Sequence, residues 1–250
     1  MTEHKTHIAS HRGGALVWPE NSPTAFHNTT KLDVEQVEFD VHPTTDGRLA
    51  VIHDATLDRT TDGSGPVAAN SFAQLQRLTL KGTQGERIPS LEDVVDIFLP
   101  TPITLRLEIK PDHERRPYPQ SPRMVIEVLK AKGALDRTVV TSFQIGTLDD
   151  VRRHGMPKGL IWLVVPQVLT DIGLRSVIDV ARAHGVGALS LHQSVLDSET
   201  LLAVRSAGLG IGGWAAHDDE PIRKMLRLGV DVFTSDRPNR AAALRAAGGW

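Results

Sequence analysis

The feature that most constrains the fold of this chain is a regular alternation of short apolar segments with longer segments of helical periodicity. Eight segments have the composition of buried strands: His7–Ser10, Val37–Val41, Ile103–Ile109, Thr138–Ser142, Leu160–Val164, Ala188–His192, Gly210–Trp214 and Val232–Thr234. Eight have helical spacing: Ser22–Leu32, Leu91–Phe98, Arg123–Ala131, Leu148–His154, Leu174–His184, Ser198–Ala207, Glu220–Leu228 and Arg240–Ala246. Eight such pairs in 250 residues predict an α/β fold of the (β/α)8 TIM-barrel type, with a doubly wound open sheet as the alternative.

A ninth extended segment, Leu49–His53, follows the second strand too closely for a helical crossover, so it should run antiparallel to that strand. Asp46-Gly47 is typical of a two-residue hairpin turn, which would place Asp40 opposite His53. The Thr- and Gly-rich residues that follow extend this excursion to about residue 90. We therefore predict one domain over residues 1–250 with a small insertion at about 43–90, above the active face of the barrel.

The charge balance and the absence of cysteine exclude several classes of protein. A net charge of -2 provides no basic field for nucleic acid or anionic lipid, so no nucleic-acid partner is expected. Without cysteine there is no disulfide framework, thiolate metal site or cysteine nucleophile, and any metal needs oxygen or nitrogen ligands. The start, Met1–His7, lacks the pattern of a signal peptide, and no stretch approaches 18 apolar residues. We expect a cytoplasmic protein with no stable membrane insertion.

Carboxylates gather where the predicted strands end, which is the catalytic face of a barrel. Glu38 and Asp40 are two residues apart, so a strand directs both to one face, and Glu108 lies on the next barrel strand. Three carboxylates facing one space fit a hard divalent cation, Mg²⁺ or Ca²⁺. The alternative interpretation is a set of ion pairs at the barrel mouth, with Arg106, Lys110 and Arg12 as the cations.

Two of the eleven histidines are predicted to approach these carboxylates. His53 would do so through the hairpin, and His11 follows the adjacent first strand. Proton transfer in both directions near neutral pH suits imidazole, so this pair is a candidate general acid and base.

Motifs along nearly the whole chain resemble those of glycerophosphodiester phosphodiesterases. They are His11-Arg-Gly-Gly, Pro19-Glu-Asn21, Glu38-Phe-Asp-Val41, Thr45-Asp-Gly47, His53-Asp54, Leu57-Asp-Arg-Thr-Thr61, Leu107-Glu-Ile-Lys110, Ser142-Phe143, Trp214 and Thr234-Ser-Asp236. Each motif alone is weak, but this many in the right order are specific. The resemblance implies a TIM barrel that uses a divalent metal to hydrolyse glycerophosphodiesters to glycerol 3-phosphate and an alcohol.

The resemblance also implies roles for individual residues, carried over onto the matching positions. The metal ligands would be Glu38, Asp40 and Glu108, with Glu20 beside them as a ligand or as the partner of one. The acid–base pair would be His11 and His53, the phosphate-binding cations Arg12 and Lys110, and the apolar residues at the glycerol end Phe143 and Trp214. Where the family has Trp-Thr-Val-Asn, this chain has Trp214-Ala-Ala-His217, which changes the polar groups at the substrate end.

Two other functions are compatible with part of this residue set. A sphingomyelinase D-like phospholipase shares the barrel, the two histidines and the acidic site, but it lacks the Arg59-Thr-Thr-Asp-Gly63 stretch and typically has disulfides. A non-catalytic phosphodiester-binding barrel would have lost a histidine or a carboxylate, and none is missing here. Either water or the glycerol 2-hydroxyl, through a cyclic phosphate, is compatible with these residues as nucleophile. The residues leave open which histidine is the acid, which alcohol is preferred and what the oligomeric state is.

Overall fold

The computed structural model describes residues 5–248 and shows a closed barrel of eight parallel strands. The strands are β1 (His7–His11), β2 (Gln36–Pro43), β4 (Thr104–Ile109), β5 (Thr138–Ser142), β6 (Gly159–Val164), β7 (Ala188–His192), β8 (Gly210–Trp214) and β9 (Val232–Ser235). Parallel pairing of β1 with both β9 and β2 closes the ring, which confirms the TIM barrel and excludes the open sheet. Each predicted barrel strand is present, with bounds shifted by at most one or two residues.

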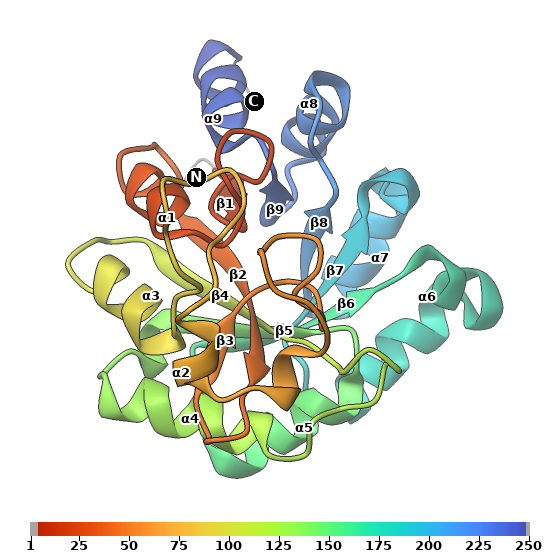
Figure 1. Cartoon of the computed structure of the whole chain (residues 1–250). Coiled ribbons are helices and arrows are strands. Elements are labelled where there is room, and N and C mark those ends of the chain that lie inside the picture. The colour runs from red at the N-terminus through yellow and green to blue at the C-terminus, as the bar shows by residue number, and fades with distance from the viewer. Residues whose placement is uncertain (1–4, 249–250) are drawn as a thin grey trace.

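Helices surround the ring and cover its outer face (Figure 1). They are α1 (Pro23–Thr29), α3 (Leu91–Phe98), α4 (Ser121–Ala131), α5 (Ile145–His154), α6 (Pro166–Ala183), α7 (Ser198–Ser206), α8 (Asp219–Leu228) and α9 (Pro238–Ala247). Local sequence sets their starts: Ser22 caps α1, Ser90 and Asp93 form a capping box on α3, and proline begins α6 and α9. The predicted start of α6 at Leu174 is wrong, because a first helical stretch from Pro166 precedes a break at Gly173, where φ is +77°.

Alternation along β2 separates packing from chemistry. Val37, Phe39 and Val41 are completely buried in the main core with helix side chains. Glu38 and Asp40 therefore point to the other face of the strand, into the barrel.

The hairpin after β2 forms, but its predicted register is wrong by one residue. In the antiparallel pair of β2 and β3 (Leu49–Val51), Val41 lies opposite Val51, and Asp40 O accepts from Ile52 N at 3.0 Å. The loop has three residues rather than two, because Thr44 N donates to Arg48 O at 2.9 Å and Gly47 adopts the left-handed conformation, with φ +76°.

The wider loop has a physical cause in the side chain at its centre. The Asp46 carboxylate accepts from the Thr44 hydroxyl at 2.6 Å and from Phe72 N at 2.9 Å. Phe72 begins the short helix α2 (Phe72–Leu75), so Asp46 ties the hairpin loop to the insertion.

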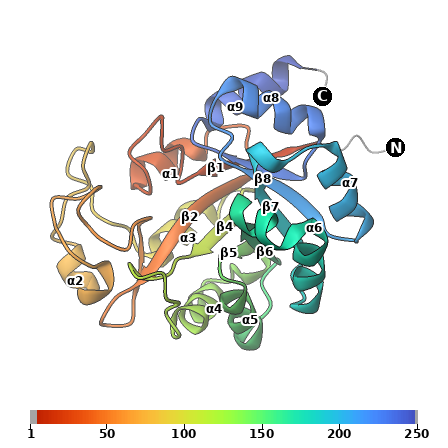
Figure 2. The same cartoon turned by 90° about the vertical axis from the view of Figure 1, so that its right-hand side faces the viewer.

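The insertion forms a small layer with its own apolar cluster. It contains β3, the short 3-10 helix Val67–Ala69 and the helix α2, and it projects from one end of the barrel (Figure 2). Its buried cluster is separate from the main core and consists of Ala50, Ile52, Leu57, Val67, Leu75, Leu80 and Ile88. The insertion thus has its own packing while it sits beside the carboxyl ends of the first strands.

Candidate active site

Three buried carboxylates meet at the carboxyl ends of β2 and β4. Glu38, Asp40 and Glu108 each have an oxygen within 4.8 Å of the others, and none is more than 4% exposed. The parallel register places Asp40 directly beside Glu108. The grouping that the strand periodicity predicted is therefore present.

Two cations form ion pairs with this cluster. Lys110 Nζ lies 2.7 Å from Glu108 Oε1 and 3.1 Å from Asp40 Oδ1, and Arg12 Nε is 3.6 Å from Asp40 Oδ2. Asp40 Oδ1 is fully buried, and the Lys110 ammonium is its close cationic neighbour. Lys110 and Arg12 thus compensate part of the negative charge of the three carboxylates.

The charges of the cluster fit a cation bound among its oxygens. Burial and the neighbouring Asp40 carboxylate raise the pKa of Glu38 to about 7, while Lys110, His53 and Arg12 outweigh burial and hold the pKa of Asp40 below its usual range. A donor set made only of carboxylate oxygens suits Mg²⁺ or Ca²⁺. The third predicted partner, Arg106, is buried below the cluster and donates to Gln36 Oε1 at 3.4 Å.

Glu20 is not brought into this cluster. Its carboxylate lies between two guanidinium groups, 3.2 Å from Arg12 Nη1 and 2.7 Å from Arg59 Nη1. It reaches the three carboxylates through Arg12, so the structure places it as a partner of a neighbouring cation.

His53 lies in the pocket with the carboxylates, although not by the route that the sequence predicts. If β3 continued in the observed register, the His53 side chain would point to the face opposite Asp40. Instead, β3 ends at Val51 and the chain bends at His53. His53 Nδ1 bonds to Asp54 Oδ1 at 2.7 Å, and Asp54 in turn accepts from Arg59 Nε at 2.7 Å. Burial lowers the pKa of His53.

His11 lines the same pocket from the end of β1. Its Nδ1 bonds to Asp236, which follows β9, and its Nε2 lies 3.7 Å from Glu38 Oε2. Burial lowers the pKa of His11, but Glu38 and Asp236 outweigh it, so the pKa is raised. Both histidines thus bond to an aspartate through Nδ1 and have Nε2 for exchange with a ligand.

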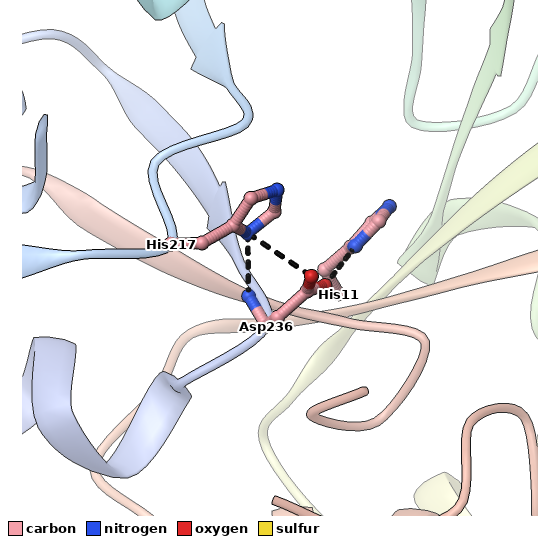
Figure 3. Close-up of side chains that lie close together, drawn as sticks. All are labelled: His11, His217 and Asp236. Carbon is pink, nitrogen blue, oxygen red and sulfur yellow. Dashed lines mark hydrogen bonds and ion pairs between the residues drawn. The ribbon is translucent and has the colours of Figure 1, made fainter. Parts of the chain in front are cut away.

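Asp236 joins His11 to a second imidazole, His217, in the loop after β8 (Figure 3). Asp236 N donates to His217 Nδ1 at 3.1 Å, so that nitrogen carries the lone pair and the neutral ring carries its hydrogen on Nε2. The carboxylate acts oppositely on His11, where Nδ1 must donate and Nε2 keeps the lone pair. Sequence reasoning did not assign Asp236 or His217 to the site, although Thr234-Ser-Asp236 and the departure at His217 both marked them.

His11, His217 and Asp236 also have ligand atoms close enough for a metal. The Nδ1 atoms of both rings already bond to Asp236, whereas the other cluster consists of three carboxylates, whose oxygens suit Mg²⁺ or Ca²⁺. The carboxylate cluster is accordingly the better cation site.

The pocket lined by Glu38, Glu108 and the imidazoles of His11, His53 and His217 has a volume of about 230 Å³. Phe143 and Trp214 form one wall, with their rings edge to face at 5.7 Å. The Trp214 indole nitrogen is buried and makes no hydrogen bond within the described part of the chain, so it offers a donor. Next to it, Ala215 has φ +65°, an uncommon backbone state for alanine that the turn toward His217 requires.

Comparison with known proteins gives one consistent result. The family model described as the glycerophosphoryl diester phosphodiesterase family matches residues 11–240. A glycerophosphodiester phosphodiesterase of Caldanaerobacter subterraneus subsp. tengcongensis is 29% identical, covering 98% of this chain and all of that protein. A crystal structure of a protein assigned as a glycerophosphoryl diester phosphodiesterase, from Agrobacterium tumefaciens, has a TM-score of 0.94 and 38% identity over 97% of this chain and 98% of its own.

Proposed function

The chain belongs to the glycerophosphoryl diester phosphodiesterase family and is an enzyme of that class, and we propose that it uses one divalent cation and a histidine pair to hydrolyse glycerophosphodiesters to glycerol 3-phosphate and an alcohol. The observation that carries this mechanism is the meeting of three buried carboxylates and two imidazoles around one pocket. Glu38, Asp40 and Glu108 hold the cation, and Mg²⁺ or Ca²⁺ suits their oxygens. When bound, the cation neutralises charge on the phosphoryl oxygens as a Lewis acid.

The phosphate and the glycerol bind to different parts of the pocket in this proposal. Lys110 and Arg12 face the phosphoryl group, because both contact the carboxylate cluster and line the pocket. Phe143 and Trp214 form the wall for the glycerol carbons, and the free indole N–H donates to a hydroxyl. His217 presents its Nε2–H to the same space as a neutral donor.

Proton transfer takes place at Nε2 of both histidines. Each ring is oriented by a carboxylate on Nδ1, Asp236 for His11 and Asp54 for His53. One ring takes the proton of the attacking water or glycerol 2-hydroxyl as its oxygen bonds to phosphorus, and the other gives a proton to the alkoxide as its bond to phosphorus breaks. If the 2-hydroxyl attacks, a water molecule then opens the cyclic phosphate to give glycerol 3-phosphate.

The test measures release of glycerol 3-phosphate from glycerophosphocholine, glycerophosphoethanolamine and glycerophosphoglycerol, with Mg²⁺, Mn²⁺ or Ca²⁺ and with excess chelator. Chelation should abolish turnover and added cation should restore it. Glu38→Gln, Asp40→Asn and Glu108→Gln should each reduce turnover or calorimetric Mg²⁺ affinity by about 10-fold or more. The matched control, Glu114→Gln, changes an exposed carboxylate outside the pocket and should have no effect. Full activity of the chelated enzyme would contradict the metal assignment.

The structure also bears on location and partners. No helix in residues 5–248 is long and apolar enough to cross a membrane. The proposed partner is the small-molecule diester, and cytoplasmic location stays a prediction from the sequence.

A further inference from the structure

A second, larger cavity opens directly from the candidate active site. It is a groove of about 680 Å³ that shares His53, Glu108, Lys110, Phe143 and Leu163 with the 230 Å³ pocket. A diester whose phosphate contacts Lys110 therefore has one substituent in the small pocket and the other in the groove. Neither the family assignment nor the proposed roles say what the groove holds.

One wall of the groove is aliphatic over a continuous stretch of chain. From Leu160 to Thr170 no residue is charged, and the groove-lining members of this stretch are Trp162, Leu163, Val164, Val165 and Val168. The indole nitrogen of Trp162 donates to Phe143 O at 3.1 Å, so its polar atom is already satisfied. This wall has no free polar group on its side chains for a hydroxyl or an ammonium group.

The aliphatic wall is reachable by a ligand as well as apolar. Val165, just before α6, is 37% exposed, whereas most apolar side chains of the barrel are buried. Exposed aliphatic surface in a concave site that continues into a catalytic pocket is typical of a ligand-binding wall. The groove is also lined by polar residues, among them Asp112, His113 and Arg115, so only part of a bound alcohol contacts aliphatic side chains.

We propose that this groove binds the leaving alcohol and selects diesters whose alcohol carries an aliphatic chain, with glycerol 3-phosphate in the small pocket. The inference rests on the proposed function, because it takes the reacting phosphorus to lie at the shared end of the two cavities. A quaternary ammonium group is the rival occupant, because such groups bind to aromatic faces and Phe143 and Trp162 also line the groove. We favour the aliphatic chain because Leu163, Val164, Val165 and Val168 form the longer part of the wall and are not aromatic.

The test uses glycerol 3-phosphate esters of ethanol, butanol and hexanol, together with the ethanolamine and choline esters, all with Mg²⁺. The alkanols have similar basicity, so differences in kcat/KM report binding of the chain. Half burial of each methylene against one wall predicts about a twofold rise per methylene, or roughly 16-fold from ethyl to hexyl.

Two variants remove the wall without touching the proposed catalytic groups. Val165→Asp and Val168→Asp should abolish the rise with chain length, so that kcat/KM for the hexyl ester falls to about that for the ethyl ester. The matched control is Ile172→Asp, which places the same charge in the same helix at a side chain that is 47% exposed and does not line the groove. The control should keep the full dependence on chain length, and thermal unfolding of all three variants verifies that they fold.

The outcomes separate the two proposals. A flat chain-length dependence with normal turnover of the ethanolamine ester overturns the groove assignment and leaves the proposed function standing. A lower KM for the choline ester than for the hexyl ester overturns it in favour of an ammonium site. An equal loss in the control variant also overturns it, because the effect would then be nonspecific. If no ester is hydrolysed under any metal condition, the proposed function itself fails.

Discussion

The two imidazoles proposed to transfer protons, His11 and His53, are held by different kinds of scaffold. His11 ends β1, and its partner Asp236 follows β9, the strand paired directly with β1 in the barrel. His53 and its partner Asp54 belong to the insertion, where a side chain that is 48% exposed, Arg59, positions the carboxylate. Equivalent Nδ1 contacts are thus fixed by backbone pairing on one side and by surface ion pairs on the other. Two imidazoles with the same proposed role can therefore differ in how firmly their orientation is held.

Removing either imidazole should produce the largest loss of kcat, and the loss should be similar for His11 and His53. His11→Ala and His53→Ala should each lower kcat by about 10²–10⁴, because each removes a proton-transfer group. His154→Ala, on the outer helix α5, is the control and should be near neutral. Wild-type kcat in His53→Ala would show that only the barrel side carries the chemistry.

The aspartates should reveal the asymmetry. Asp236→Asn should lower kcat by about 10- to 100-fold, because it weakens the orientation of His11 in the barrel wall. Asp54→Asn should cost no more than about 10-fold, since Asp54 is partly exposed and shares its oxygens with Arg59. Long-range proton–nitrogen NMR of the imidazoles checks the cause: Asp236→Asn should perturb the His11 tautomer while His217 keeps its hydrogen on Nε2. Equal losses in the two variants would remove the asymmetry.

A smaller effect should come from the surface ion pairs alone. Arg59→Met should lower kcat by a few-fold relative to the wild type. The difference between the two proteins should shrink at 1 M salt, because exposed charges are then screened over about 3 Å. Asp236→Asn provides the contrast, because its loss should be nearly independent of salt. A salt-independent Arg59→Met defect would place Arg59 among the rigid contacts.

The smallest effect concerns stability and its pH dependence. Arg59 lowers the pKa of both Glu20 and Asp54, through hydrogen bonds that outweigh burial in Glu20. A carboxylate with a lowered folded pKa contributes stability above its unfolded pKa of about 4, and the contribution is lost as pH falls through the folded value. Arg59→Met should therefore unfold at a lower temperature at pH 7, by an amount worth about 1 kcal/mol or less. The difference should begin to shrink below about pH 4 and keep shrinking as the pH falls further, because the folded pKa of Asp54 lies well below its usual range. A difference that stays constant as the pH falls would point to lost packing instead.

The sequence predicted the barrel and the carboxylate cluster because both depend on strict periodicity. Glu38 and Asp40 share a face whatever the loops do, and the strand order brings Glu108 beside them. The hairpin register was wrong because it depended on one tertiary contact, between Asp46 and the start of α2, which a turn motif does not encode. His53 still reaches the pocket, because the chain leaves the strand before it.

The barrel-side positioning residues were missed for a different reason. Asp236 lies 225 residues from His11, and only closure of the ring by β1 and β9 brings them together. The role of His217 depends on one backbone amide that donates to its ring. The early start of α6 was missed because Gly173 interrupts the helical periodicity.

The separate apolar cluster of the insertion has a consequence for its motion. Ile52, Leu57 and Leu80 pack with the rest of that small cluster and not within the barrel core, so the segment can open as a unit while the ring stays intact. Its amide hydrogens should exchange with solvent before those of the strands. Because His53 lies on this segment, each such opening would carry its imidazole away from that of His11. The amide exchange rate of the insertion therefore sets an upper bound on the time for which the two imidazoles stay together in the pocket.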